Sequence, residues 1–289
     1  MTNLQPSLFD TAKPDNSISG FINREAKRMW PSDQHRKRSI AQVNSFIRFN
    51  ANKSRPLRQF LASDIDDFAD HMIANGSSEA TVNRYLASVS KVFNHAVSKR
   101  VIPHAPKATF FKAQSQRIRY FSDDEVKAIL SFFRSRGDWW MADMVTLATK
   151  TGMRKGEIVA LGEGRATISL CGRWINLPAE VTKTSKERNV PISNEEAHRA
   201  AHRLADAMAN HYSKKAFEYR WSLCKREIAR DDDTFVFHVT RHTAASRMAN
   251  DLEVPTVIIA EALGHASLAT TQKYVHAKPD TLLDISARM

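Results

Sequence analysis

Apolar residues recur every three or four positions along much of residues 18–100, which is the spacing of one face of a helix. The clearest run follows Ser77 and Ser78, either of which can serve as its N-cap. Its apolar positions are Val82, Leu86, Val89, Val92, Phe93 and Val97. The pattern predicts a long amphipathic helix within a small helical domain that spans residues 18–100.

A shorter amphipathic run precedes this helix. Ser63 and Asp66 have the spacing of a capping box, and apolar residues between Phe68 and Ile73 follow them. Gly76 stands where such a helix would stop. The sequence therefore predicts a second helix that is capped by Ser63 and ends near Gly76.

Residues 101–118 interrupt the helical pattern with two prolines and several polar side chains, which is typical of an interdomain linker. Residues 119–289 then read as a second domain. It opens with Ser122 and Glu125 in the spacing of another capping box, ahead of an apolar helical run. A chain of 289 residues is long enough for two such domains.

The second domain mixes helical and strand patterns. A helix is expected over residues 143–161, interrupted or bent near Gly152. Residues 167–170 and 173–177 alternate like strands around a Cys171–Gly172 turn, and residues 181–183 and 189–192 suggest another hairpin. Helices are expected over the remainder. The fold class is thus mainly α with a small antiparallel β-sheet in the second domain.

Residues 1–17 are polar, contain two prolines and are expected to form a flexible N-terminal tail. Within this tail, Gln5, Leu8 and Phe9 resemble the short peptides that dock on bacterial sliding clamps. This resemblance covers five residues and makes a sliding clamp one expected partner.

Cysteine usage and hydropathy indicate a protein of the cytoplasm. Cys171 and Cys224 have no paired spacing, which excludes a disulfide framework and fits a reducing compartment. No signal peptide is visible, and no apolar run approaches the ~20 residues that span a bilayer. We expect no membrane partner and a location in the bacterial cytoplasm, with the nucleoid.

The formal net charge of +12 is distributed unevenly. Residues 18–119 hold 18 Lys and Arg against 7 Asp and Glu, whereas residues 120–289 hold 24 against 22. Nearly the whole excess therefore lies in the predicted helical domain. A basic domain of this kind attracts the phosphates of a nucleic acid.

Candidate chemistry is concentrated in four segments of the second domain. They read TGMRKGEI (151–158), TKTSKERNVPI (182–192), HVTRHTAAS (238–246) and LGHASLATTQKYVH (263–276). The side chains of interest are two arginines, one lysine, two histidines and one tyrosine, namely Arg154, Arg241, Lys183, His238, His265 and Tyr274. This set suits the cleavage of a phosphodiester without a metal ion.

Each residue type has a chemical reason to be present. Arg154 and Arg241 can stabilise the charge that a phosphoryl group develops, because a guanidinium binds phosphate through two parallel hydrogen bonds. Tyr274 can act as a nucleophile that forms a covalent intermediate. Lys183 and a histidine can transfer protons if their pKa values lie near the working pH.

At these residues the chain resembles the tyrosine recombinase family, which includes phage integrases, the Xer recombinases and Cre. The family's T-G-x-R-x-x-E helix matches Arg154 and Glu157, and its hairpin lysine matches Lys183. The other matches are the H-x-x-R-H box at residues 238–242, the L-G-H-x-S box at residues 263–267, and the Y-x-H at residues 274–276. The family usually has leucine before its second arginine, where this chain has Thr240.

The resemblance implies a C-shaped clamp of two domains around DNA, and a role for each site residue. Tyr274 would attack the scissile phosphate to give a 3′-phosphotyrosyl link. Arg154, Arg241 and His265 would hold the non-bridging oxygens, Lys183 would protonate the leaving 5′-oxygen, and His238 would accept the tyrosine proton. Glu157 and His242 are expected to hold these catalytic side chains in place. Four basic residues of the helical domain are expected to contact DNA, namely Arg84, Lys91, Lys99 and Arg100.

The same resemblance implies particular partners. These are double-stranded DNA with inverted-repeat core sites, three further copies of this chain in a homotetramer on DNA, and an accessory directionality factor. Neither ATP nor a metal cofactor is needed, because one phosphodiester is exchanged for another. Residues 281–289 carry Leu282, Leu283 and Ile285, which could dock on a neighbouring subunit.

Several alternatives stay open at this point. A type IB topoisomerase uses similar residues, and a DNA-binding regulator could retain them without activity. A metal-dependent hydrolase is disfavoured, because Val239 stands where the H-E-x-x-H zinc motif needs glutamate after His238. Within the recombinase family, the sequence does not distinguish a phage integrase from a Xer-like resolvase or a transposon recombinase, nor does it give the target DNA.

Overall fold

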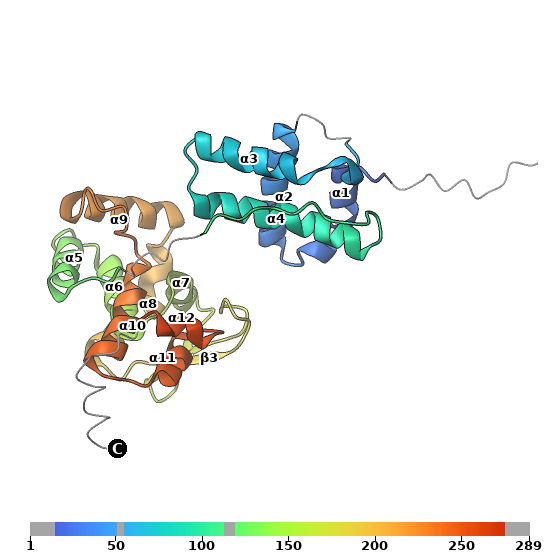
Figure 1. Cartoon of the computed structure of the whole chain (residues 1–289). Helices are drawn as coiled ribbons and strands as arrows, with labels where there is room; N and C mark the ends of the chain where they lie inside the picture. Colours follow the sequence, from blue (N-terminus) through green and yellow to red (C-terminus); the bar gives the residue numbers. More distant parts are fainter. Residues whose placement is uncertain (1–14, 51–54, 113–118, 275–289) are drawn as a thin grey trace, which may run out of the picture. The chain divides into compact units, whose positions relative to one another are not determined.

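The computed structural model describes residues 15–50, 55–112 and 119–274. The chain divides into two compact units, Met1–Ser115 and Gln116–Met289. They are called the N-terminal unit and the C-terminal unit below and are drawn in Figure 1. Each has its own buried hydrophobic cluster.

The N-terminal unit is a bundle of helices. A 3-10 turn, η1 (Leu57–Gln59), lies between its second and third α-helices. The α-helices are α1 (Ile18–Met29), α2 (Asp33–Phe49), α3 (Ala62–Ala74) and α4 (Glu79–Ser98). Phe46 of α2 lies at the centre, where its ring contacts those of Phe68 and Phe93 at centroid distances of 5.5 and 6.4 Å. The predicted helical character of this region is confirmed.

The helix starts show one correct and one wrong prediction. Ser78 is the N-cap of α4, and its hydroxyl accepts a hydrogen bond from the N–H of Thr81. The capping box that was predicted at Ser63 is wrong. Instead, α3 begins at Ala62, and the carboxylate of Asp64 accepts the N–H of Leu61 at 2.7 Å. Arg55 holds that carboxylate in place through two hydrogen bonds of 2.8 and 2.9 Å, a contact nine residues away.

The predicted linker, residues 101–118, is described as far as residue 112. Figure 1 shows this segment running back along α4. Ile102 is buried in the core of the N-terminal unit. Further along, the Asn83 side chain donates to the carbonyl of Phe111 at 2.8 Å and accepts its N–H at 2.9 Å. Residues 101–112 therefore pack as part of the N-terminal unit.

The C-terminal unit is built around one buried helix, α6 (Trp139–Thr151), which packs against four others. Nearly every residue of α6 is buried, as expected for a helix that is apolar on all sides. The neighbouring helices are α5 (Asp123–Ser135), α7 (Lys155–Gly162), α8 (Glu195–Ala207) and α10 (Val239–Ser246). The predicted capping box at the start of α5 is confirmed, since Ser122 and Glu125 exchange two hydrogen bonds.

The remaining helical segments of the C-terminal unit complete its other side. They are η2 (Met208–Asn210), α9 (Lys214–Ile228), the π-helical turn η3 (Arg247–Asp251), α11 (Thr256–Leu263) and α12 (Leu268–Gln272). Helix α11 contacts both η3 and α12. The end of the described chain therefore folds back beside α10 and α11.

Gly152 ends α6, as predicted, with a left-handed φ of 70°. A side chain here would also be blocked, because a Cβ would lie 2.3 Å from the Leu263 side chain of α11. The chain then turns at once into α7, whose N-cap is Arg154. This sharp break places Arg154 at a helix start and near the end of α11.

Three short antiparallel strands form the sheet in the order β1 (Thr167–Ile168), β2 (Trp174–Leu177) and β3 (Arg188–Pro191). The predicted first hairpin is confirmed, although its strands are shorter than expected. The second predicted hairpin is wrong, because β3 pairs with β2 and residues 181–186 form turns. The buried Thr182 closes these turns, since its hydroxyl bonds both the N–H and the carbonyl of Lys186. The fold class, mainly α with a small antiparallel sheet, is confirmed.

Candidate active site

Arg241 lies at the centre of the candidate site, in the first turn of α10, and its side chain is buried. Its guanidinium donates to the carbonyls of Gly152, at 2.5 Å, and Leu263, at 2.6 Å. Both carbonyls are freed by helix ends, those of α6 and α11. Burial lowers the pKa of Arg241 to about 9, and the charge of Arg154 adds to this effect. The group remains a cation at neutral pH, held by neutral partners.

Arg154 points into the same region from the start of α7. One guanidinium nitrogen donates to Glu157 at 2.8 Å and the other to the carbonyl of Gly264 at 3.2 Å. Glu157 also accepts the backbone N–H of Arg154, which caps the helix. Because Glu157 is 1% exposed and uses both oxygens, it fixes the direction of the arginine.

Arg188 is a third arginine in this cluster, and it is not among the site residues that the motifs predicted. It begins β3, its side chain is 8% exposed, and it donates to Glu157 at 2.5 Å and to the carbonyl of Ala262. One carboxylate therefore serves both Arg154 and Arg188. The available signal was the place of Arg188 in the segment TKTSKERNVPI (182–192), five residues after Lys183.

His265 follows the left-handed turn of Gly264 at the end of α11. Its Nδ1 lies 2.8 Å from the hydroxyl of Thr271, a fully buried residue of α12. The pKa of His265 is lowered to about 4, first by burial and then by the charges of Arg241, Arg154 and Arg188. The ring is therefore neutral at pH 7, with one nitrogen already engaged. Thr271 is another supporting residue that the motif match did not indicate.

Tyr274 comes just after α12 and is the last described residue. It is 6% exposed, and its phenol oxygen lies 2.5 Å from Nδ1 of His242. Its ring stacks on that of His265, with 6.4 Å between centroids and 15° between planes. Burial raises the pKa of Tyr274, whereas the charge of Arg241 acts in the opposite direction. The phenol of Tyr274 thus lies beside the imidazoles of His242 and His265. The arginines of this site belong to the same chain.

His238 is the N-cap of α10 and lies at the surface of the unit. Its ring approaches that of His242, one helical turn on, with 4.7 Å between centroids. Partial burial lowers the pKa of His238. The charges of Arg241, Arg154 and Lys183 contribute to this shift. His238 therefore belongs to the same electrostatic environment as the arginines, while the hydrogen bond to the phenol runs to His242.

Lys183 is exposed in the turns between β2 and β3. Its charge reaches the candidate site, as the lowered pKa of His238 indicates. Lys186 is also exposed, on the far side of the turn that Thr182 closes. The structure therefore brings together five of the six predicted residues closely and places Lys183 on an adjacent loop.

A largely apolar pocket of about 470 Å³ adjoins the cluster. His238 and Arg241 form one of its walls, while Phe217, Trp221 and Phe237 form the apolar part. The Lys155 ammonium lies 4.4 Å from the centre of the Phe217 ring at its edge. Of the three clustered arginines, Arg241 is the one that borders this hollow in the surface of the C-terminal unit.

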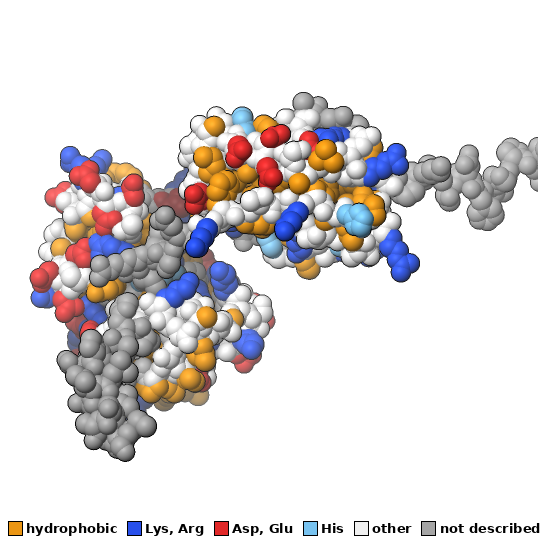
Figure 2. All heavy atoms as spheres, in the orientation of Figure 1, with side chains coloured by type: hydrophobic (Ala, Val, Ile, Leu, Met, Phe, Trp, Pro, Cys, Tyr) orange, Lys and Arg blue, Asp and Glu red, His pale blue; other side chains and the backbone are white. Residues whose placement is uncertain are grey.

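The four residues predicted to contact DNA all lie at the surface of the N-terminal unit. Arg84 and Lys91 extend from α4, and Lys99 and Arg100 follow its end. Figure 2 shows Lys and Arg side chains over α4, whereas acidic side chains gather over α3. The two helices therefore present opposite charge, and α4 is the better match for phosphates.

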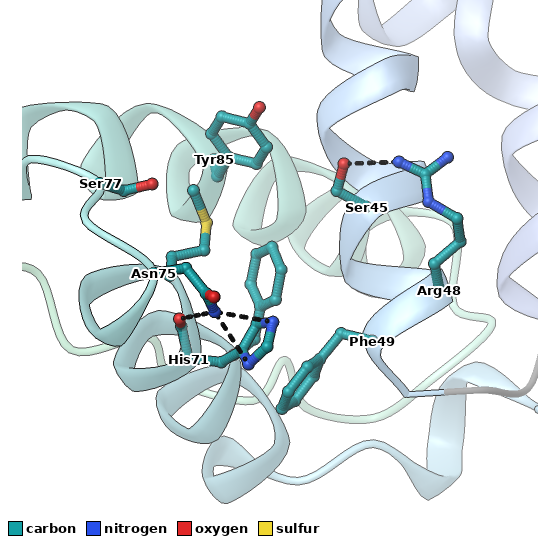
Figure 3. Close-up of a pocket in the computed structure, with 9 residues that line it drawn as sticks. Ser45, Arg48, Phe49, His71, Asn75, Ser77 and Tyr85 are labelled. Carbon is teal, nitrogen blue, oxygen red and sulfur yellow. Dashed lines mark hydrogen bonds between the residues drawn. The ribbon is translucent and has the colours of Figure 1, made fainter.

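The N-terminal unit also has a pocket of about 430 Å³, where α2, α3 and the start of α4 meet (Figure 3). Phe49 and His71 face each other there, with 4.9 Å between ring centroids. Arg48 lies at the edge and bonds Ser45 at 3.0 Å.

Some predictions lie outside the described residues. They concern the N-terminal peptide with Gln5, Leu8 and Phe9 that resembles sliding-clamp ligands, the histidine of the Y-x-H pattern, and the apolar residues of 281–289. Within the described ranges, no helix has both the length and the apolar character needed to cross a membrane. The same ranges contain no cluster of three His, Cys, Asp or Glu side chains that could hold a metal ion.

A buried tyrosine, two imidazoles and three arginines thus lie together on this helical fold. Two family models match the chain, the phage integrase family over residues 119–280 and the phage integrase SAM-like domain over residues 18–113. The chain belongs to the phage integrase family, and it is a site-specific tyrosine recombinase.

Individual relatives agree with this assignment. The chain is similar to tyrosine recombinase XerC of Pelobacter propionicus, with 26% identity over 267 residues that cover 80% of this chain and 85% of the relative. It is also similar to the integrase of Haemophilus phage HP1, with 26% identity over 72% of this chain and 59% of the relative.

Solved structures share the fold. The integrase of the transposon Tn1549, in complex with circular intermediate DNA, matches with a TM-score of 0.72, covering 93% of this chain and 99% of that one, at 16% identity. A lambda integrase dimer bound to a core site matches with a TM-score of 0.68, covering 91% and 96% of the two chains, at 15% identity.

Proposed function

We propose that this recombinase cuts and rejoins duplex DNA through a covalent link between Tyr274 and the 3′ end of the broken strand. The observation that carries the proposal is the buried phenol of Tyr274, which lies beside Arg241 and two imidazoles of the same chain. A phosphate that entered here would meet fixed cations and a nucleophile together.

The steps assign one role to each group. The phenol of Tyr274 gives its proton to a neighbouring imidazole while its oxygen attacks phosphorus, and the bond from phosphorus to the 5′-oxygen breaks. Arg154 and Arg241 stabilise the charge on the non-bridging oxygens, and His265 adds a hydrogen bond. Lys183 gives a proton to the leaving 5′-oxygen. The 5′-hydroxyl of a partner strand later attacks the phosphotyrosine and releases the phenol.

This cycle conserves the number of phosphodiester-type bonds, so it needs neither ATP nor a metal ion. Exchange between two duplexes needs four active sites, and we therefore propose a homotetramer on inverted-repeat core sites. The helical domain expected from the sequence, residues 18–100, would bind DNA through α4. The linker at 101–118 would join it to the second domain, residues 119–289, which would carry out the chemistry. The biological task would be integration, excision or resolution of a phage or another mobile element, with a directionality factor as a further partner.

A covalent trapping assay tests the proposal. The full chain is incubated with nicked duplexes tiled from the DNA that flanks its own gene, in excess chelator and without ATP. A nick just 3′ of the cleavage site leaves a short fragment that bears the 5′-hydroxyl and diffuses away, so the protein–DNA joint accumulates on a denaturing gel. Tyr274→Phe should bind the same duplex without forming the joint. A joint that persists in Tyr274→Phe would exclude this nucleophile.

The same assay separates the alternatives. A topoisomerase of type IB would relax a supercoiled plasmid that lacks the flanking DNA, and would exchange no strands between two duplexes. A regulator that has lost activity would bind the flanking DNA but form no joint. A metal-dependent hydrolase would release product that is not linked to protein, and would stop in chelator.

A further inference from the structure

The phenol of Tyr274 has a direct hydrogen-bond partner, and this partner is not the histidine that the family resemblance assigned. Nδ1 of His242 lies 2.5 Å from the phenol oxygen. The two rings are tilted by 37°, with 5.6 Å between their centroids. The phenol and the imidazole are therefore in direct hydrogen-bond contact, which is the geometry that a general base needs.

His238 has a different orientation. It lines the pocket beside Arg241, together with the aromatic residues of α9, and it meets His242 edge to face. Because both histidines lie on one face of α10, four residues apart, His242 stands between His238 and the phenol. His238 therefore faces the pocket, and His242 faces the nucleophile.

We propose, on the basis of the function proposed above, that His242 is the catalytic residue that accepts the proton of Tyr274 during cleavage. The O–H bond of the phenol breaks and an N–H bond forms at Nδ1 of His242, while the phenol oxygen bonds to phosphorus. In the rejoining step the same proton returns from Nδ1 to the phenolate as the 5′-hydroxyl attacks. His238 is left free to bind a phosphate oxygen.

The surroundings of His242 also explain why the phenol is not ionised without DNA. The pKa of His242 is lowered to about 4, first by burial and then by the neighbouring His238 and Arg241. A phosphate anion beside Arg241 would offset that cation and strengthen the imidazole as a base. Proton acceptance is then coupled to the arrival of the scissile phosphate. Asn250 holds the nucleophile in place meanwhile, through its hydrogen bond to the Tyr274 carbonyl at 3.2 Å.

The test replaces the base and changes the acidity of the phenol independently. His242→Gln and the matched control His238→Gln are each prepared with tyrosine and with 3,5-difluorotyrosine at position 274. The fluorinated phenol is more acidic and depends less on a base. Single-turnover formation of the covalent joint is measured on the nicked flanking duplex, with DNA binding and melting temperature as controls.

With tyrosine at position 274, His242→Gln should cleave about 100-fold or more slowly than the unsubstituted chain. Difluorotyrosine should restore most of this loss in His242→Gln and little of any loss in His238→Gln. An equal defect with both phenols would overturn the proposal, because His242 would then only position the ring. Rescue of His238→Gln alone would also overturn it, in favour of His238 as the acceptor.

A second substitution keeps the test valid if glutamine disturbs folding. Histidine methylated on Nδ1 cannot accept the phenol proton, whereas histidine methylated on Nε2 keeps Nδ1 as the acceptor. The Nδ1-methylated chain should lose cleavage and the Nε2-methylated chain should retain it; the opposite order, or equal rates, contradicts the proposal. If the unsubstituted chain forms no joint at all, the proposed function fails, whereas failure of these comparisons alone leaves that function intact.

Discussion

Glu157 is the residue whose change should show how strongly the arginine cluster depends on one carboxylate. Its two oxygens bind the side chains of Arg154 and Arg188 at 2.8 and 2.5 Å, and its side chain is almost completely buried. Glu157→Gln keeps the shape but removes the negative charge, so two guanidinium groups face a neutral amide. The substitution therefore tests stability and cleavage together.

The expected magnitude follows from burial. Breaking a buried ion pair costs about 3–5 kcal/mol, because a charge is left without its partner. Arg188 has little access to water, whereas Arg154 is partly exposed and can be hydrated, so we expect the lower end, about 3 kcal/mol. For a unit of this size, 1 kcal/mol corresponds to roughly 2–4 °C. The melting temperature of the C-terminal unit should thus fall by about 6–12 °C.

Cleavage should slow by about 10- to 100-fold, because Arg154 loses the group that directs it, and small misplacements of catalytic groups are costly. Scanning calorimetry and the covalent trapping assay measure the two effects. The matched control is Asp143→Asn, another buried carboxylate, whose partner Arg203 is 55% exposed and can turn to water. This control should lose about 1 kcal/mol and cleave normally. Glu157→Gln with unchanged melting and cleavage would refute the reasoning.

Three further predictions concern the lysine loop, the end of α6 and pH. Lys183→Ala should slow cleavage about 100-fold with little effect on binding, whereas Lys186→Ala should cleave normally; trapping rates in the reverse order would identify the other lysine. Gly152→Ala should lower the melting temperature more than Gly164→Ala, since both have a φ near 70° but the Cβ meets open space only at Gly164. Stability should fall as pH drops from 7 toward 4, because the unfolded chain binds a proton at His265 near pH 6.5 and the folded chain only at about 4. His265→Gln should reduce this slope in melts between pH 7 and 5, and an equal slope would contradict the assignment.

Much of the secondary structure could be predicted because its signals are local. Ser78, Ser122 and Gly152 mark helix ends through contacts within a few residues of themselves. The two wrong predictions depended on longer contacts. The start of α3 is set by Arg55, nine residues from its partner Asp64, and strand β3 pairs with β2 rather than with the nearer residues 181–183.

The candidate site divides in the same way. The motifs predicted which residues gather, because their order and spacing match a known family. They could not predict which atoms meet, since His242 and Tyr274 are 32 residues apart and Arg188 and Glu157 are 31 apart. The family pattern even favoured His238 as the partner of the phenol, and the α10 helix instead turns its neighbour His242 toward it. Atomic partners depend on the packing of α10 against α11 and α12.

The lowered pKa values of the site share the same two causes. Burial lowers the pKa values of Arg241, His242 and His265 first, and neighbouring positive charge, with fewer carboxylates than cations around it, adds to the effect. Glu157 compensates Arg154 and Arg188, and Arg241 is left with backbone carbonyls. The electrostatic free energy of such a site is unfavourable without an anion. It becomes more favourable when a phosphate enters, since the phosphate supplies the missing negative charge. The free energy that this neutralisation releases is then available where charge develops most, on the phosphoryl group under attack by Tyr274. The same imbalance that limits the stability of the free C-terminal unit therefore favours its binding to the DNA backbone.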